Sequence, residues 1–151
     1  MIIAVDFDGT VVYHRYPDIG EDIGAVPVLK ALIACGHKII LNTMRSHPMH
    51  PGDRDTLQEA VDWFKENNIE LYGVNENPTQ ILWTSSPKPY AHVYIDDSAI
   101  GCPLRPDGAV DWKVLDYMFQ KYGFYEPLEK VHMRDIARKY NSYDQDKESS
   151  D

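Results

Sequence analysis

The stretch MIIAVDFDGT, residues 1–10, decides the fold that we expect for the rest of the chain. Its apolar start is typical of a buried β-strand, and it ends in two carboxylates, Asp6 and Asp8, before Gly9 allows the backbone to turn. Side chains two positions apart in a strand point to the same side. Asp6 and Asp8 are therefore suited to hold a divalent cation or a phosphoryl group, and the simpler alternative is a solvated strand end.

The composition is that of one globular domain with a real core. The 151 residues are 43% hydrophobic and 26% charged, which allows a folded core and excludes a disordered chain. The formal net charge of -9 opposes binding to nucleic acid, so we do not expect a nucleic-acid partner. An acidic site that meets a phosphate would need a cation.

The chain lacks the signals of membrane insertion or secretion. It has no apolar run of the roughly 20 residues that cross a bilayer, and no basic segment precedes the first apolar run. We therefore expect a cytoplasmic protein. Cys35 and Cys102 show neither a metal-site spacing nor a disulfide framework.

Strands and helices are expected to alternate along the chain. The predicted strands are residues 1–5, 38–41, 71–74 and 90–95, and the predicted helices are 27–36, one that Asp53 or Asp55 caps, 111–122 and 126–140. This order predicts an α/β fold, a three-layer Rossmann-like parallel sheet with helices on both faces. We expect one domain over residues 1–140 and an acidic disordered tail over 141–151.

Polar residues follow the predicted strands where ligands bind in such sheets, at the carboxyl ends. Asn42 and Thr43 follow the second strand, Asp96 and Asp97 follow the fourth, and Lys88 lies just before the fourth. Each has a simpler explanation: a helix cap for Thr43, a turn for the two acids, a solvated loop position for Lys88. Their joint order favours a single site.

In this order the motifs Asp-Phe-Asp-Gly-Thr, Asn-Thr, Lys and Asp-Asp resemble the four motifs of the haloacid dehalogenase (HAD) superfamily of phosphohydrolases. The resemblance spans residues 1 to about 100, and its specific part is residues 6–10. The chain also resembles a small group of phosphatase-like HAD proteins that have no cap domain. Family members insert a cap between the motifs, in intervals that correspond here to residues 11–41 and 44–87. The expected helices, strands and loops already fill both intervals. We therefore expect no cap domain.

The resemblance implies a role for each motif residue. Asp6 would be the nucleophile that forms an aspartyl-phosphate, and Asp8 would protonate the leaving oxygen and then take a proton from water. Thr43 would hydrogen-bond the transferring phosphoryl group, and Lys88 would pair with that group and with Asp6.

The resemblance also implies a metal site. An all-oxygen site suits Mg²⁺, whose protein ligands would be the Asp6 carboxylate, the Asp8 backbone carbonyl and one of the final acids. The family pattern favours Asp97 over Asp96, although the sequence alone does not rank them.

Three further residues are candidates for binding substrate: Asn42, Arg45 and His14. Asn42 precedes Thr43, and His14 lies in the loop after the expected nucleophile. Arg45, two residues after Thr43, is expected either to bind phosphate or substrate or to lie on the surface.

The expected function is Mg²⁺-dependent hydrolysis of a small phosphate monoester, such as a sugar phosphate or a nucleotide. One alternative is a phosphatase for a polynucleotide end or a phosphoprotein. Another is a non-catalytic protein that binds metal or receives a phosphoryl group. A site without a cap is open to solvent. We therefore also expect a homo-oligomer in which a neighbouring subunit covers the site.

Overall fold

The computed structural model describes residues 1–126. The predicted helix over 126–140 and the predicted tail over 141–151 lie outside the described residues, apart from residue 126 itself. Among residues 1–126, no helix is both long enough and apolar enough to cross a membrane.

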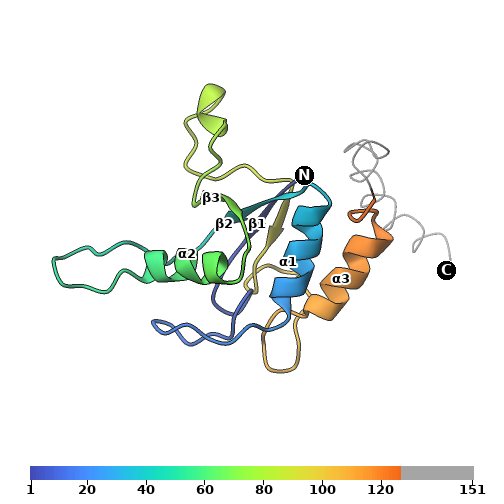
Figure 1. The fold of residues 1–151 in the computed structure, drawn as a ribbon, viewed down its shortest axis with the longest axis horizontal. Helices are drawn as coiled ribbons and strands as arrows, with labels where there is room; N and C mark the ends of the chain where they lie inside the picture. The colour runs from blue at the N-terminus through green and yellow to red at the C-terminus, as the bar shows by residue number, and fades with distance from the viewer. Residues whose placement is uncertain (127–151) are drawn as a thin grey trace.

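A four-stranded parallel sheet forms the centre of the fold, with strand order β3-β2-β1-β4 (Figure 1). Its strands are β1 (Ile2–Val5), β2 (Lys38–Leu41), β3 (Leu71–Val74) and β4 (Val93–Ile95). The pairing aligns Val5 with Leu41 on one side and with Ile95 on the other, so the carboxyl ends of these three strands lie level. The four predicted strands are confirmed in position and order along the chain.

Strand β4 begins three residues later than the predicted strand over 90–95. The amide N–H groups of Tyr90 and Ala91 donate to the side chains of Gln80 and Tyr94, at 2.7 and 3.0 Å, and not to β1. The ladder with β1 begins only where His92 donates to the carbonyl of Ile2. One side-chain acceptor from the 3-10 helix η1 (Gln80–Leu82) and one from β4 itself therefore shorten the strand.

Three α-helices follow strands β1, β2 and β4: α1 (Ala25–Ala34), α2 (Thr56–Glu66) and α3 (Trp112–Lys121). At the start of each helix an aspartate accepts backbone N–H groups, and it is the N-cap residue itself in α2 and α3 but not in α1, whose N-cap is Gly24. Asp22 accepts from Ala25, Asp55 from Gln58, and Asp111 from Lys113 and Val114. Asp55 is thus the cap of α2, and α1 begins two residues before the predicted start.

The described α-helices all contribute to one hydrophobic cluster. Right-handed crossovers from β1 to β2 and from β2 to β3 place α1 and α2 on the same face of the sheet, and α3 packs beside α1 (Figure 1). The cluster joins one set of alternate strand residues to the helices, and its members include Ile3, Val5, Ile39, Leu41, Leu29, Leu32, Phe64, Leu115 and Phe119.

The other face of the sheet has a different cover. Ala4 and Ile40 pack there against Ala91, with Tyr72 at the border. The segment between β3 and β4 has a short 3-10 helix, η1 (Gln80–Leu82), and is otherwise irregular. Prolines at 78, 87 and 89 interrupt this segment. Within residues 1–126 the predicted α-helical layer on this second face is therefore not found.

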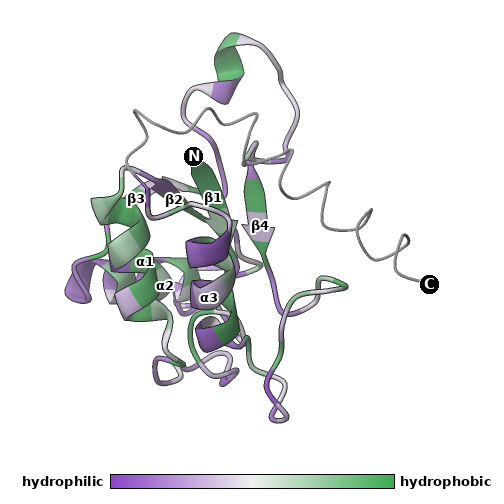
Figure 2. Cartoon of the chain, turned by 90° about the vertical axis from the view of Figure 1, so that its right-hand side faces the viewer, coloured by the Kyte–Doolittle hydropathy of each residue, from purple (hydrophilic) through white to green (hydrophobic). Residues whose placement is uncertain are grey.

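The distribution of hydropathy matches this arrangement, as Figure 2 shows. The strands are apolar, and the helices turn polar residues toward the outside. The exception is η1, which projects away from the sheet with Ile81, Leu82 and the neighbouring Trp83 exposed.

Candidate active site

The carboxyl ends of β1 and β4 bring three carboxylates together. Asp6 extends the pairing of β1, because its N–H donates to the carbonyl of Ile95 at 2.9 Å. Asp96 and Asp97 directly follow Ile95. One carboxylate oxygen from each of Asp6, Asp96 and Asp97 lies within 4.8 Å of the others. Strand pairing therefore gathers acids that are about 90 residues apart in the sequence.

An open cavity of about 360 Å³ lies over this cluster. Its acidic lining comes from Asp6, Asp8 and Asp97, and its other lining residues are His14, Tyr16, Thr43, Met44 and Ser98. Asp6, Asp8, Thr43 and Asp97, which were placed together because they follow strand ends, therefore line one cavity, and His14 from the loop after Asp8 lines it too.

Thr10 holds the two halves of the acidic cluster together. Its side chain is fully buried, and its hydroxyl oxygen accepts the N–H of Asp97 at 3.0 Å. The same hydroxyl lies 3.5 Å from an Asp6 oxygen and 3.3 Å from an Asp97 oxygen, and it donates to one of them. The sequence shows Thr10 as the last residue of the Asp-Phe-Asp-Gly-Thr motif but does not predict that it links Asp6 to Asp97.

Gly9 allows Asp97 to approach the turn after β1. Its φ is +79°, and a Cβ at this position would lie 2.6 Å from Oδ2 of Asp97. Any larger residue would therefore have to displace the carboxylate as well as adopt a strained backbone.

Burial and mutual repulsion raise the pKa values in the cluster. Burial first, and then the charges of Asp96, Asp97 and Asp8, raise the pKa of Asp6 to about 6, although a hydrogen bond from the backbone of Phe7 lowers it. Burial and the charge of Asp96 also raise the pKa of Asp97. A bound cation would relieve this repulsion.

The donor set fits a hard divalent cation. Three carboxylate oxygens converge from Asp6, Asp96 and Asp97, and all-oxygen sites of this kind suit Mg²⁺ or a similar ion. Asp8 directs its carboxylate elsewhere.

Arg45 occupies the Asp8 carboxylate with two hydrogen bonds. Its Nε and Nη2 donate to the two oxygens of Asp8, each at 2.7 Å, and only 1% of the Arg45 side chain is exposed. Its remaining N–H groups donate to the carbonyls of Pro17, Asp18 and Thr56. The guanidinium also lies between the rings of Phe7 and Tyr16, 5.1 and 5.3 Å from their centroids.

This placement corrects both expectations for Arg45. The side chain is neither on the surface nor free to bind a phosphate, because its donors are already used within the protein. Its contacts hold Asp8 in one orientation and attach residues 16–18 to the site. Each Asp8 oxygen accepts a single N–H from Arg45, so further lone pairs remain for a group in the cavity.

Thr43 is positioned by its neighbours at the end of β2. Its N–H donates to the Asn75 side chain at 2.8 Å, and its hydroxyl accepts the N–H of Arg45 at 3.2 Å. Asn75 adopts a positive φ of 51°, which asparagine tolerates. Asn42 extends the pairing of β2 by donating to the carbonyl of Val5, and its side chain does not line the cavity.

Lys88 is not beside Asp6 in this structure. Its ammonium group lies 4.9 Å from the centre of the Tyr94 ring, and Lys88 does not line the acidic cavity. No ion pair joins Lys88 to Asp6 within the described part of the chain. The predicted contact between these two residues is therefore absent.

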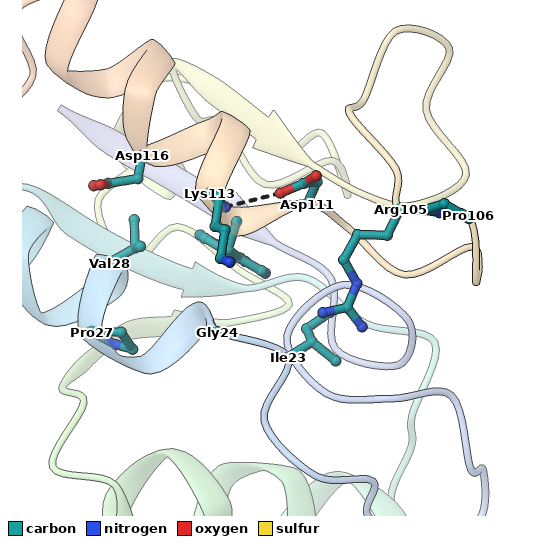
Figure 3. Close-up of a pocket in the computed structure, with 10 residues that line it drawn as sticks. Ile23, Gly24, Pro27, Val28, Arg105, Pro106, Asp111, Lys113 and Asp116 are labelled. Carbon is teal, nitrogen blue, oxygen red and sulfur yellow. Dashed lines mark hydrogen bonds between the residues drawn. The ribbon is translucent and has the colours of Figure 1, made fainter.

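A second, larger cavity of about 690 Å³ lies between the N-termini of α1 and α3 (Figure 3). Two of its charged side chains, Asp111 and Arg105, already have hydrogen-bond partners. Asp111 accepts the N–H of Lys113, and Arg105 donates to Asp107 and to the hydroxyl of Tyr13. In the acidic cavity, Asp6 and Asp97 form no ion pair within residues 1–126, and this cavity is therefore the better candidate for chemistry.

Comparisons with known proteins give one solved relative. It is described as a conserved protein coded by a locus of Bacteroides thetaiotaomicron, and it shares 36% sequence identity with this chain. The match covers 90% of this chain and 96% of the relative, with a TM-score of 0.64. The chain belongs to the family of that protein.

The description of the Bacteroides protein names no activity. No protein-family model matches the chain, and no curated protein matches it. The function of this family has to be argued from the site.

Replacing Arg45 by alanine should destabilise the fold by about 3 kcal/mol, because the Asp8 carboxylate would lose its buried partner. Chemical denaturation would measure the loss. Arg54→Ala is the control, since Arg54 forms two ion pairs, with Asp18 and Glu59, at an exposed position. Equal losses in the two variants would contradict the importance of the buried pair.

Replacing Gly9 by alanine should weaken binding of a divalent cation at least tenfold while costing about 1–2 kcal/mol of stability. The new Cβ must push the Asp97 carboxylate out of the cluster. Gly101→Ala is the matched control, because Gly101 also has a positive φ but its Cβ would meet open space. Calorimetric titration with Mg²⁺ or Mn²⁺ would distinguish them, and unchanged binding by Gly9→Ala would contradict the geometry.

Replacing Asp6 by asparagine should stabilise the metal-free protein at pH 7.5 and have little effect at pH 4. Because the folded-state pKa is raised from 3.8 to about 6, ionisation of Asp6 lowers the free energy of unfolding as the pH rises through this range. The expected gain is about 1–2 kcal/mol after allowing for solvent screening. Denaturation in EDTA at both pH values would measure it, with exposed Glu70→Gln as control. A gain of the same size at both pH values would exclude this origin.

Proposed function

We propose that the chain is a metal-dependent phosphohydrolase of the HAD type that cleaves a phosphate monoester. The single observation that carries this proposal is the convergence of the Asp6, Asp96 and Asp97 carboxylates under an open cavity that Asp8 and Thr43 also line. A phosphate dianion is repelled by such a cluster unless a cation and hydrogen-bond donors neutralise it. A structural role for these partly buried acids would not explain why their mutual repulsion is retained.

Asp6 is the proposed nucleophile. Its carboxylate oxygen forms a bond to phosphorus while the bond from phosphorus to the ester oxygen breaks. For this step Asp8 has to be protonated on one oxygen while the other still accepts from Arg45, and this proton passes to the leaving oxygen. Water then attacks the aspartyl-phosphate and gives a proton to Asp8. Cleavage of the bond between phosphorus and Asp6 releases inorganic phosphate, restores the Asp6 carboxylate and leaves Asp8 protonated again.

Other residues of the chain orient these groups. Arg45 holds Asp8 through both oxygens, Thr10 holds Asp97 against Asp6, and Asn75 holds the backbone of Thr43. The Thr43 hydroxyl would donate to a phosphoryl oxygen. Asp6, Asp96 and Asp97 would hold the Mg²⁺, which when bound supplies positive charge against the phosphoryl oxygens.

Lys88 is the proposed second positive charge. Its ammonium lies over the face of the Tyr94 ring, an interaction worth about 1 kcal/mol or less at a partly exposed site. Binding of a phosphate dianion at Asp6 would provide a stronger partner. Lys88 would therefore move from the ring to the phosphate when substrate binds.

The open site agrees with a HAD protein that lacks a cap domain. Residues 6–24 and 42–55, which connect β1 to α1 and β2 to α2, contain loops and isolated bridges. Neither connection folds into a separate layer over the cavity. A small phosphate ester could enter directly.

Hydrolysis of p-nitrophenyl phosphate would test the proposed chemistry. Turnover should require Mg²⁺, stop in EDTA and fall to background in Asp6→Asn. Lys88→Ala should lower kcat/KM by about 100-fold. Lys38→Ala should leave it unchanged, because Lys38 lies over the Tyr72 ring in the same kind of contact, 4.4 Å from its centre.

Metal binding without turnover of this ester would count against the proposed activity. A stable phosphorylated form on Asp6 would instead support a protein that receives a phosphoryl group. Equal activity of wild type and Asp6→Asn would exclude the nucleophile.

A further inference from the structure

The rim of the acidic cavity carries two large apolar side chains in exposed positions. Tyr16 is 57% exposed and Met44 is 97% exposed, and both line the cavity that contains Asp6. Exposed apolar groups gain nothing from folding in that position. Here they are the only large apolar side chains that line the cavity within residues 1–126.

The Tyr16 ring is held in place by Arg45. The ring packs on the Arg45 guanidinium, which lies 5.3 Å from the ring centre and is itself fixed by Asp8 and by the carbonyls of Pro17 and Asp18. The remainder of the ring is free to meet a ligand. A ring whose orientation is fixed before binding provides a stacking platform at low entropic cost.

Met44 provides an adaptable second contact. It directly follows Thr43, whose hydroxyl is the proposed hydrogen-bond donor to the phosphoryl group, so its position relative to a bound phosphate is limited by the backbone. Its flexible thioether makes favourable contacts with aromatic rings. A rigid aromatic ring and a mobile thioether on one rim suit a flat, apolar group.

We propose that the site selects phosphate esters whose leaving group carries a planar ring, as in a nucleoside monophosphate. The phosphate would lie at Asp6, and the ring would bind between Tyr16 and Met44. This inference rests on the proposed function for the place of the phosphate. The acidic surroundings favour a ring without negative charge, because Asp8 and Asp97 line the same cavity.

Two substrates test this selectivity: adenosine 5′-monophosphate, which carries a planar adenine ring, and ribose 5-phosphate, which has a hydroxyl in its place. The full-length wild type with Mg²⁺ should have a kcat/KM at least tenfold higher for the nucleotide. Tyr16→Leu and Met44→Ala should reduce this ratio toward one, while Tyr16→Phe should preserve it. If a Tyr16 variant hydrolyses ribose 5-phosphate at the wild-type rate, the substitution has not displaced Arg45 and Asp8.

Matched controls come from exposed residues away from the cavity. Tyr117 is 63% exposed on α3 and Met49 is 84% exposed in the loop before α2. Tyr117→Leu and Met49→Ala should leave the ratio unchanged. A ratio near one in the wild type, or an equal loss for both substrates in Tyr16→Leu, would overturn the inference.

Calorimetric binding to Asp6→Asn with Mg²⁺ separates this inference from the proposed function. Tighter binding of the nucleotide than of ribose 5-phosphate, lost on adding Tyr16→Leu, would support the ring site even if the wild type shows no turnover. Turnover of both esters with equal binding would support the phosphohydrolase and overturn the ring site. Absence of nucleotide binding would also overturn it.

Discussion

The buried ion pair between Arg45 and Asp8 connects more parts of the site than any other interaction in residues 1–126. It joins the turn after β1 to the segment after β2, and the same guanidinium binds the carbonyls of residues 17 and 18 and of Thr56 at the start of α2. A guanidinium buried without such partners would be very costly. The loop that carries Tyr16 is therefore fixed by the same interaction that fixes Asp8.

The other three acids lack an equivalent partner in the described residues. Asp6, Asp96 and Asp97 face one another, and burial together with repulsion raises the pKa of Asp6. Such a cluster costs folding stability in the absence of a cation. Proteins accept this cost at functional sites, where the unfavourable charge becomes useful once a ligand binds.

The site thus has a charged floor and an apolar rim with different physical roles. In the proposed function, charge at the floor would attract a cation and, through it, a phosphate. The exposed Tyr16 and Met44 at the rim offer contacts that a phosphate does not need. In the proposed function, the acids at the floor would carry out the reaction and the side chains at the rim would select the substrate.

The sequence by itself determined the local elements and most of the acidic site. Apolar runs, helical periodicity and aspartate caps depend on neighbouring residues, so they predicted the strands and the starts of α2 and α3 closely. Because parallel strands end at one edge, the acids at positions 6, 8 and 97 could be placed together without a structure. Thr10 was visible in the same motif, although its role as a link between Asp6 and Asp97 was not.

Only the tertiary structure decided which groups are paired and which are free. Asp8, the partner of Arg45, lies 37 residues away in the sequence. No local sequence pattern therefore predicts that the N–H groups of Arg45 are all hydrogen-bonded within the protein. Side-chain acceptors on Gln80 and Tyr94 shortened β4, and Lys88 lies over a ring rather than beside Asp6. The cover of the second sheet face and the rim of the cavity likewise depend on loops whose paths are set by distant contacts, which periodicity does not encode.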